Sequence, residues 1–287
     1  MVKPASGSPK SSAMARRSSH EMAIVRSATA RTKNRVRVLG CPIDNLTLAE
    51  TLHCVEEFVR DGTPRQHVVV NVDKLVKFTK DPALREIIES CDLINVDGQP
   101  VVWAARLLGI NLKERVAGID LMEALIDLAN TNDWTVYFLG AKAAVVEKLV
   151  SRYQRDLPTL RVVGWRDGYW TNSEESSVVE TVREKHPDLL FVGISSPKKE
   201  QFVNKYLQRL NVPFVMGVGG SFDVFAGVTR RAPGWMRRFG LEWFWRFLQE
   251  PRRMWKRYFV DDLSFVVLLA RHLIRRYFRH EHRSRDS

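Results

Sequence analysis

Residues 134–163, WTVYFLGAKAAVVEKLVSRYQRDLPTLRVV, decide the fold class of this chain. The β-branched and aromatic run at residues 134–139 stops at Gly140 and predicts a strand. Residues 143–155 predict a helix, and residues 160–163 predict a second strand. A strand, a helix and a strand in this order form a βαβ unit, whose two strands lie parallel.

The same alternation continues on both sides of this unit. Further strands are predicted at residues 68–70, 93–96, 189–192 and 213–218. Helices are predicted at residues 81–90, 100–108, 173–185 and 199–210. Short strands separated by helices predict an α/β fold with a Rossmann-like, mostly parallel sheet and helices on both faces.

Sheets of this kind bind ligands beyond the carboxyl ends of their strands, so function is expected in the loops after the strands. These loops begin at Asn71, Asp97, Gly140, Gly193 and Gly219. The carboxylate of Asp97 either takes a proton from a substrate or caps the helix that starts at Pro100. The amide of Asn71 either holds a sugar hydroxyl or caps the next helix.

A glycine-rich turn, Gly217-Val218-Gly219-Gly220-Ser221-Phe222-Asp223, follows the last predicted strand. Glycines at such a turn let backbone N–H groups approach a phosphate closely, so the turn indicates a site for a phosphate or a nucleotide. It lacks the third glycine of the dinucleotide fingerprint and comes late in the chain, which disfavours NAD. The motif Pro197-Lys198-Lys199-Glu200 is typical of an exposed helix start, where Glu is favoured.

Charge divides this chain of 287 residues, whose net charge is +12, into three parts. Residues 1–37 carry nine Lys or Arg and one Glu, and their composition predicts a disordered basic arm. Residues 38–229 carry a net charge of −5 and form the predicted α/β catalytic domain. Residues 230–287 carry a net charge of +9 and no strand pattern, which predicts a helical appendage. Basic ends attract polyanions, either nucleic acid or an anionic membrane surface.

In the appendage, arginines interleave with aromatic residues. Leu263, Val267, Ala270 and Ile274 fall near one face of a predicted helix, and arginines fall on the other. Such a helix lies in a membrane interface, with its arginines at anionic headgroups. The alternatives are a helix packed on the enzyme or on a partner, and binding of nucleic acid, for which the chain carries no motif.

Several classes of protein are disfavoured by what the sequence lacks. No stretch reaches the ~18–20 apolar residues that span a bilayer, and the N-terminus has no apolar run typical of a secretory signal. Cys41, Cys54 and Cys91 form no CxxC pair and predict a reducing compartment. The histidines show no metal spacing and no DxD pair is present, so no metal site is expected.

Taken in order, the motifs of this chain resemble those of the WecG/TagA/CpsF glycosyltransferases, glycosyltransferase family 26. The resemblance covers residues 38–260, and the ordered set makes it specific, since each motif alone is short. The motifs are Asp97-Gly98, Val101-Val102-Trp103-Ala104-Ala105-Arg106, Glu114-Arg115-Val116, Phe138-Leu139-Gly140, Pro197-Lys198 with Glu200, Gly217-Val218-Gly219-Gly220 with Phe222-Asp223, Arg231-Ala232-Pro233, Leu241-Glu242-Trp243, Arg246, and Glu250-Pro251 with Arg253.

The resemblance implies an inverting transfer of sugar from a UDP-sugar to a polyprenyl-diphosphate-linked saccharide, in bacterial cell-surface or exopolysaccharide synthesis. It implies that Asp97 is the general base and that the appendage brings arginines to the diphosphate. It also implies a peripheral enzyme on the cytoplasmic face of the inner membrane. The implied partners are the UDP-sugar, the lipid-linked acceptor and an anionic membrane surface, without cofactor or nucleic acid. The implied substrate-binding residues are Asn71, Gly98, Arg106, Arg115, Gly140, Lys198, Lys199, Glu200, Gly219, Gly220, Asp223, Arg231, Arg246, Arg253 and Arg257.

Two positions depart from the family pattern, because Val69 stands where Thr is frequent and Lys199 where Gln is frequent. The sequence therefore does not identify the transferred sugar, the acceptor or the linkage. It does not give the oligomeric state either, for which a homo-oligomer is one alternative. Two other functions also stay open from the residues alone. One is a Rossmann-type nucleotide-binding oxidoreductase, and the other is a non-catalytic protein that binds membrane or nucleic acid through its basic ends.

Overall fold

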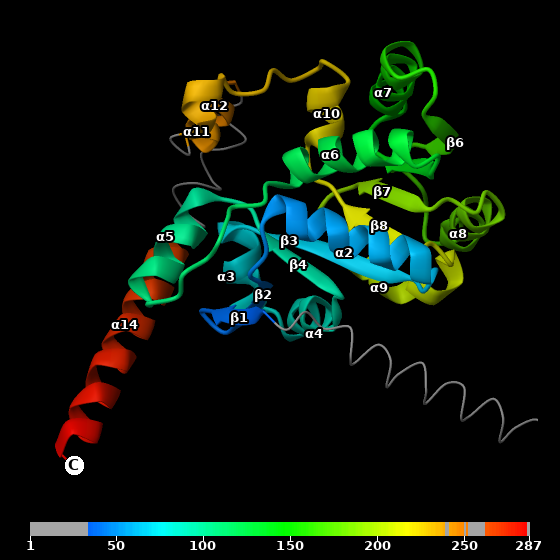
Figure 1. Ribbon diagram of the computed structural model, residues 1–287. Helices are drawn as coiled ribbons and strands as arrows, with labels where there is room; N and C mark the ends of the chain where they lie inside the picture. Colours follow the sequence, from blue (N-terminus) through cyan, green and yellow to red (C-terminus); the bar gives the residue numbers. More distant parts are fainter. Residues whose placement is uncertain (1–33, 239–240, 250, 252–261, 286–287) are drawn as a thin grey trace, which may run out of the picture. The chain divides into compact units, whose positions relative to one another are not determined.

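The computed structural model describes residues 34–238, 241–249, 251 and 262–285, with the backbone alone at residues 237–238, 243, 246, 262 and 275–285 (Figure 1). Most of the predicted basic arm therefore lies outside the described residues. Residues 35–37, which the sequence assigned to that arm, form strand β1 (Arg35–Val38) together with Val38. The folded body thus begins before residue 38.

The centre of the fold is a six-stranded sheet in the order β4-β3-β8-β7-β5-β6. Every neighbouring pair in it is parallel, which confirms the predicted Rossmann-like sheet. Each predicted strand is present. The strands are β3 (Arg65–Val70), β4 (Leu93–Val96), β5 (Thr135–Gly140), β6 (Arg161–Arg166), β7 (Leu189–Gly193) and β8 (Phe214–Gly217).

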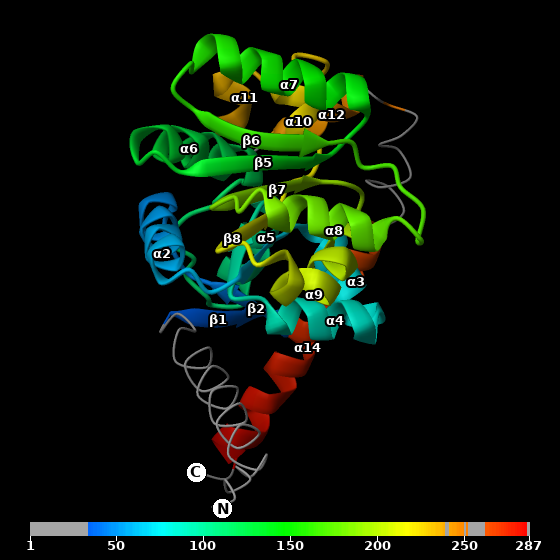
Figure 2. The same ribbon diagram turned by 90° about the vertical axis from the view of Figure 1, so that its right-hand side faces the viewer.

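Helices cover both faces of the sheet (Figure 2). One apolar cluster is shared by α2 (Leu48–Asp61), α6 (Gly118–Thr131), α7 (Ala143–Asp156) and α10 (Ser221–Phe225). Two clusters on the opposite face are shared by α3 (Val72–Lys80), α4 (Pro82–Ser90), α5 (Gln99–Leu107), α8 (Glu175–Glu184) and α9 (Lys198–Leu210). Along β5, Val136 and Phe138 join the first cluster and Tyr137 and Leu139 the opposite face. Because both faces are covered, the strands read as continuous apolar runs.

The loops after β3 and β8 diverge, although the two strands are neighbours. β3 leads into α3, which packs on α4, whereas β8 leads into α10, which packs on α6 and α7. Ligands of such sheets bind beyond the carboxyl ends of strands whose connections diverge. Since β4 lies on the other side of β3, the loops that begin at Asn71, Asp97 and Gly219 meet at this edge of the sheet.

A hairpin of β1 and β2 (Cys41–Asp44) lies against β4 and was not predicted from the sequence. Its turn places Leu39 and Gly40 at positive φ, as tight hairpins require. The carboxylate of Asp44, a residue 2% exposed, accepts hydrogen bonds from the Arg35 side chain and from the backbone N–H of Ile94, both at 2.8 Å. This buried carboxylate ties the hairpin to the sheet.

The described part of residues 230–287 is helical, as predicted, with α11 (Gly234–Arg238), α12 (Glu242–Gln249) and α14 (Asp262–Arg285). Phe265 of α14 is 6% exposed and packs with α3 in one apolar cluster. Leu263, Val267 and Ile274 project from the other side of α14 and are exposed. The predicted apolar face is therefore open, and a second face holds the helix to the body. Within the described residues, no helix is both long and apolar enough to cross a bilayer.

Gly140 is a position where the fold requires glycine, since its φ is +128° and a Cβ there would lie 2.6 Å from the carbonyl carbon of Gly193. We expect Gly140→Ala to lower the free energy of unfolding by about 1–3 kcal/mol, measured by urea denaturation. Gly219→Ala is the matched control, because a Cβ at Gly219 meets nothing within 4 Å. Equal stability of the two variants would contradict the expectation.

Candidate active site

Asp97 follows β4 directly, at the edge of the sheet where the loops meet. Its backbone N–H donates to the carbonyl of Val70, 2.9 Å away, which aligns the ends of β4 and β3. The N-cap of α5 is Gly98, with φ +117°, and no side chain caps this helix. The N-cap position that the sequence left open for Asp97 is therefore taken by Gly98.

The carboxylate of Asp97 lies between a cation and a backbone donor. Its Oδ1 is 3.7 Å from a guanidinium nitrogen of Arg115, and its Oδ2 accepts a hydrogen bond from the N–H of Gly118 at 3.4 Å. Both contacts favour the charged carboxylate. The side chain is 37% exposed, so the carboxylate is accessible at the carboxyl end of the sheet to a substrate that gives up a proton.

Asn71 caps α3, the role that the sequence gave as its alternative. Its Oδ1 accepts a hydrogen bond from the backbone N–H of Lys74 at 2.9 Å. This bond fixes the carboxamide at the carboxyl end of β3. A sugar hydroxyl would then meet the carboxamide nitrogen, since the oxygen serves the cap.

The glycine-rich turn after β8 holds its backbone close to a buried side chain on one side and leaves it open on the other. A Cβ at Gly217 would lie 2.8 Å from Cε of Lys199, whereas a Cβ at Gly219 would meet nothing within 4 Å. Gly219 and Gly220 are exposed, and Gly220 is the N-cap of α10. Asp223 closes the turn of α10, because its carbonyl accepts from the N–H groups of Val228 and Thr229. The turn therefore presents an exposed backbone, as an anion site requires.

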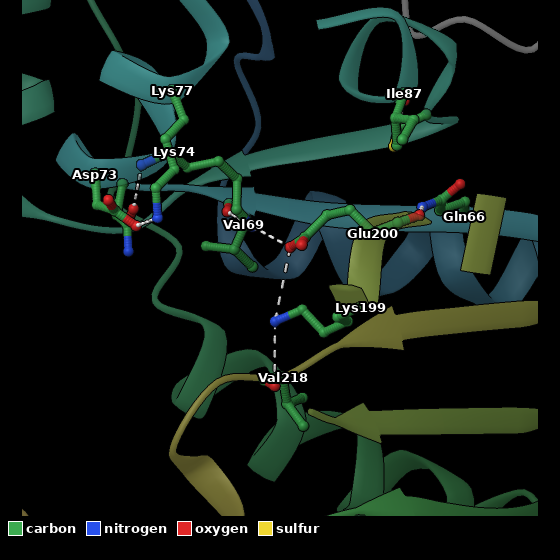
Figure 3. Close-up of polar contacts among 11 residues, drawn as sticks. Gln66, Val69, Asp73, Lys74, Lys77, Ile87, Lys199, Glu200 and Val218 are labelled. Carbon is green, nitrogen blue, oxygen red and sulfur yellow. Dashed lines mark hydrogen bonds and ion pairs between the residues drawn. The ribbon is translucent and has the colours of Figure 1, made fainter. Parts of the chain in front are cut away.

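Three buried charged side chains lie beneath these loops and are shown in Figure 3. Nζ of Lys74 lies 2.8 Å from Oε1 of Glu200 and donates at 2.8 Å to the carbonyl of Val69. Nζ of Lys199 lies 3.8 Å from the same Oε1 and donates at 3.3 Å to the carbonyl of Val218. We call Lys74, Glu200 and Lys199 the buried triad. It joins α3 and α9 to the ends of β3 and β8.

Burial and mutual attraction set the charges of the buried triad. Desolvation, with repulsion from Lys74, lowers the pKa of Lys199 to about 8. Desolvation alone would raise the pKa of Glu200, but the two ammonium groups outweigh it and lower that pKa to about 2. The triad therefore sets one ionised carboxylate against two lysine side chains, so basic groups are in excess beneath the glycine-rich turn.

A second set of ion pairs joins the C-terminal segment to the start of α6. Arg231 pairs with Asp120 and, at 3.2 Å, with Glu123. Arg115 donates a hydrogen bond to Oε2 of Glu242, the first residue of α12, at 3.0 Å. These contacts bring residues from 230–249 close to Asp97.

The predicted basic residues Arg106, Lys198, Arg246, Arg253 and Arg257 differ in where they lie. Arg106 is exposed on the last turn of α5, at the end of the helix away from Gly98, so the structure does not bring it to Asp97. The ammonium of Lys198 lies 5.3 Å from the ring centre of Trp170, in a cation–π contact. The Arg246 side chain, Arg253 and Arg257 lie outside the described residues.

Sequence reasoning missed two residues that contact this site. Lys74 was not singled out, although a lysine in the first turn of a helix opposes the helix dipole and so signals a specific partner. Glu242 was noted within its motif but not as a site residue. Its partner, Arg115, is 127 positions away in the sequence, so spacing gave no signal for the pair.

With this geometry established, comparison with known proteins identifies the relationship. A family model described as "Glycosyl transferase WecG/TagA/CpsF family" matches residues 36–279. The chain belongs to this family. The resemblance inferred from the ordered motifs is therefore confirmed, and the protein is a glycosyltransferase.

Two curated relatives show what this glycosyltransferase is similar to. Both are named N-acetylglucosaminyldiphosphoundecaprenol N-acetyl-beta-D-mannosaminyltransferase. The protein from Bacillus spizizenii is 37% identical over 193 residues, which are 67% of this chain and 74% of the relative. The protein from Staphylococcus aureus is 30% identical over 244 residues, which are 84% of this chain and 95% of the relative.

The buried triad of this glycosyltransferase depends on its single carboxylate. We expect Glu200→Gln to lower the free energy of unfolding at pH 7 by about 3–5 kcal/mol, because two buried ammonium groups would lose their counter-ion. Chemical denaturation followed by circular dichroism measures this loss.

The matched control for Glu200→Gln is Glu89→Gln. Glu89 pairs at 3.2 Å with Arg37, and both side chains are well exposed. An exposed pair contributes about 0–1 kcal/mol, so the control should remain close to wild type. If both variants lost the same stability, the triad would not carry the role assigned to it.

Proposed function

We propose that this glycosyltransferase transfers a sugar from a UDP-sugar to a saccharide linked to polyprenyl diphosphate, with inversion at the anomeric carbon. The observation that carries the proposal is the carboxylate of Asp97, which lies at the carboxyl end of β4, is 37% exposed and is 3.7 Å from the guanidinium of Arg115. The names of both relatives support the acceptor, since they describe transfer to N-acetylglucosaminyldiphosphoundecaprenol. The product would enter the synthesis of a cell-surface or extracellular polysaccharide.

In the proposed reaction, Asp97 acts as the general base. It accepts the proton of the acceptor hydroxyl while that oxygen attacks the anomeric carbon from the face opposite UDP. The C1–O bond to the diphosphate breaks as the new glycosidic bond forms, so the configuration at C1 inverts. The bond from the N–H of Gly118 orients the carboxylate, and the guanidinium of Arg115 lies 3.7 Å from it.

The leaving UDP gains negative charge, and the loop after β8 is suited to stabilise that charge. Exposed backbone at Gly219 and Gly220 offers N–H groups to the diphosphate, and the basic groups of the buried triad lie beneath that loop. Arginines of the C-terminal segment would add further positive charge. The proposed reaction uses the UDP-sugar as donor and no cofactor.

The transferred sugar is the open part of the proposal. The relatives are named for N-acetylmannosamine transfer. In this chain, Lys199 and Val69 stand where the family pattern favours Gln and Thr. Lys199 is a member of the buried triad, and the carbonyl of Val69 accepts a hydrogen bond from Lys74. A screen of UDP-sugars for turnover with a polyprenyl-diphosphate saccharide identifies the donor.

We further propose that the enzyme works as a peripheral protein on the anionic inner surface of the bacterial inner membrane. Leu263, Val267 and Ile274 form an open apolar strip along α14, with Arg271 exposed beside it. A helix with this pattern inserts its apolar strip into the headgroup region and places its arginines among anionic lipids. Because α14 packs on α3 through its other side, that contact would hold the enzyme at the lipid surface.

Asp97→Asn tests the assignment of the general base. We expect it to lower the rate of sugar transfer at least ~100-fold, because an amide cannot accept the proton, while affinity for UDP stays near that of wild type. Transfer is measured by product formation on the lipid-linked acceptor and UDP affinity by calorimetry. Asp156→Asn, in an exposed ion pair on α7, is the control. Transfer within tenfold of wild type in Asp97→Asn would rule out the proposed base.

Val267→Glu with Ile274→Glu tests the membrane contact. We expect the double variant to bind phosphatidylglycerol vesicles at least ~10-fold more weakly in a flotation assay, since two apolar side chains no longer enter the bilayer. Val228→Glu is the control, because Val228 is exposed on a segment outside α14. Unchanged flotation of the double variant, or an equal loss in the control, would contradict the assigned surface.

A further inference from the structure

Arg115 lies between two carboxylates from different parts of the chain. One guanidinium nitrogen is 3.0 Å from Oε2 of Glu242 and 3.7 Å from Oδ1 of Asp97. The Arg115 and Glu242 side chains are 19% and 22% exposed, so water screens their interaction only in part. Asp97 follows β4 in the catalytic body, whereas Glu242 begins α12 in the C-terminal segment. The guanidinium of Arg115 therefore connects that segment to the candidate base.

We propose that Glu242 is a positioning residue that engages Arg115 and so keeps Asp97 basic enough to take the acceptor's proton. The inference rests on the proposed function, in which Asp97 is the general base. Glu242 touches no reacting atom in this scheme. It acts through the guanidinium that it shares with Asp97.

Without Glu242, the guanidinium of Arg115 would be free to pair directly with the carboxylate of Asp97. A guanidinium beside a carboxylate lowers the pKa of that carboxylate by about 1–3 units when the two pair directly. A carboxylate paired in this way is a weaker base, and proton transfer to it is slower. By accepting the hydrogen bond from Arg115, Glu242 holds the guanidinium at the longer distance from Asp97 and offsets its charge.

Other carboxylates near Arg115 also offset its positive charge, as Glu242 does. Asp120, on the first turn of α6, also interacts with Arg115 and is itself paired with Arg231. Glu123 of α6 pairs with Arg231 in turn. Among the described residues, this group holds two arginines and four carboxylates, so carboxylates outnumber guanidinium groups around Arg115. The members are Asp97, Arg115, Asp120, Glu123, Arg231 and Glu242.

A consequence of this arrangement is that base strength depends on the docking of α12. Glu242 contacts Arg115 only with α12 in its place beside the loop that precedes α6. When α12 is displaced, Arg115 is released to Asp97 and the base weakens.

The experiment compares the pH dependence of kcat/KM for wild type, Glu242→Gln and Glu242→Asp with a fixed UDP-sugar and lipid-linked acceptor. We expect Glu242→Gln to move the acidic limb to lower pH by roughly one unit, because the pKa of Asp97 falls. Its plateau should fall roughly three- to tenfold, because the base is weaker. Glu242→Asp retains the negative charge and should restore much of the wild-type profile. Glu147→Gln, exposed on α7, is the control for loss of one surface carboxylate.

The possible outcomes separate this inference from the proposed function. A uniform loss of activity in Glu242→Gln, with an unmoved acidic limb, would overturn the inference and indicate a structural role. An unchanged profile would overturn it as well. If Glu242→Gln fails to fold, Glu242→Asp carries the test, since its shorter reach should give a smaller shift in the same direction. Full activity of Asp97→Asn would instead overturn the base assignment itself, whatever Glu242 does.

Discussion

The ends of β3 and β8 are held by buried charge, and the candidate site depends on this constraint. Lys74 binds the last carbonyl but one of β3, Lys199 binds the carbonyl that follows β8, and Glu200 lies between the two ammonium groups. Isolated charges at this depth would cost several kcal/mol each, so their mutual pairing and their carbonyl partners are what make the arrangement tolerable. Because both strand ends are fixed, the loops that start at Asn71 and Gly219 keep one relative position.

Much of the fold could be predicted from the sequence because its signals are local. A parallel sheet covered on both faces gives apolar strands, and Gly140 closes β5 where φ is positive, so strand and helix limits appear directly in the sequence. The hairpin of β1 and β2 escaped prediction because it depends on Asp44, whose partner Ile94 lies 50 positions away. Pairing across such distances leaves no periodic signal within either segment.

The candidate site could be predicted only in part, for the same reason. Asp97 and Asn71 were found because a strand end followed by a polar side chain is a local pattern. The structure places Asn71 at the N-cap of α3, whereas the N-cap of α5 is Gly98 and not Asp97. The partners of Asp97 and Glu200 come from distant segments, so neither the buried triad nor the contact of Arg115 with Glu242 could be derived from spacing.

The packing of α14 through one side, with its apolar side left open, has a kinetic consequence for an enzyme whose proposed acceptor is confined to a bilayer. One side of the helix is committed to α3, and α3 begins at the cap formed by Asn71. An enzyme bound through the other side would meet its acceptor by lateral diffusion in two dimensions and its soluble donor in three. Encounter with the acceptor would then depend on its surface density, and the rigid contact with α3 would keep the mouth of the site at a constant height above the lipid.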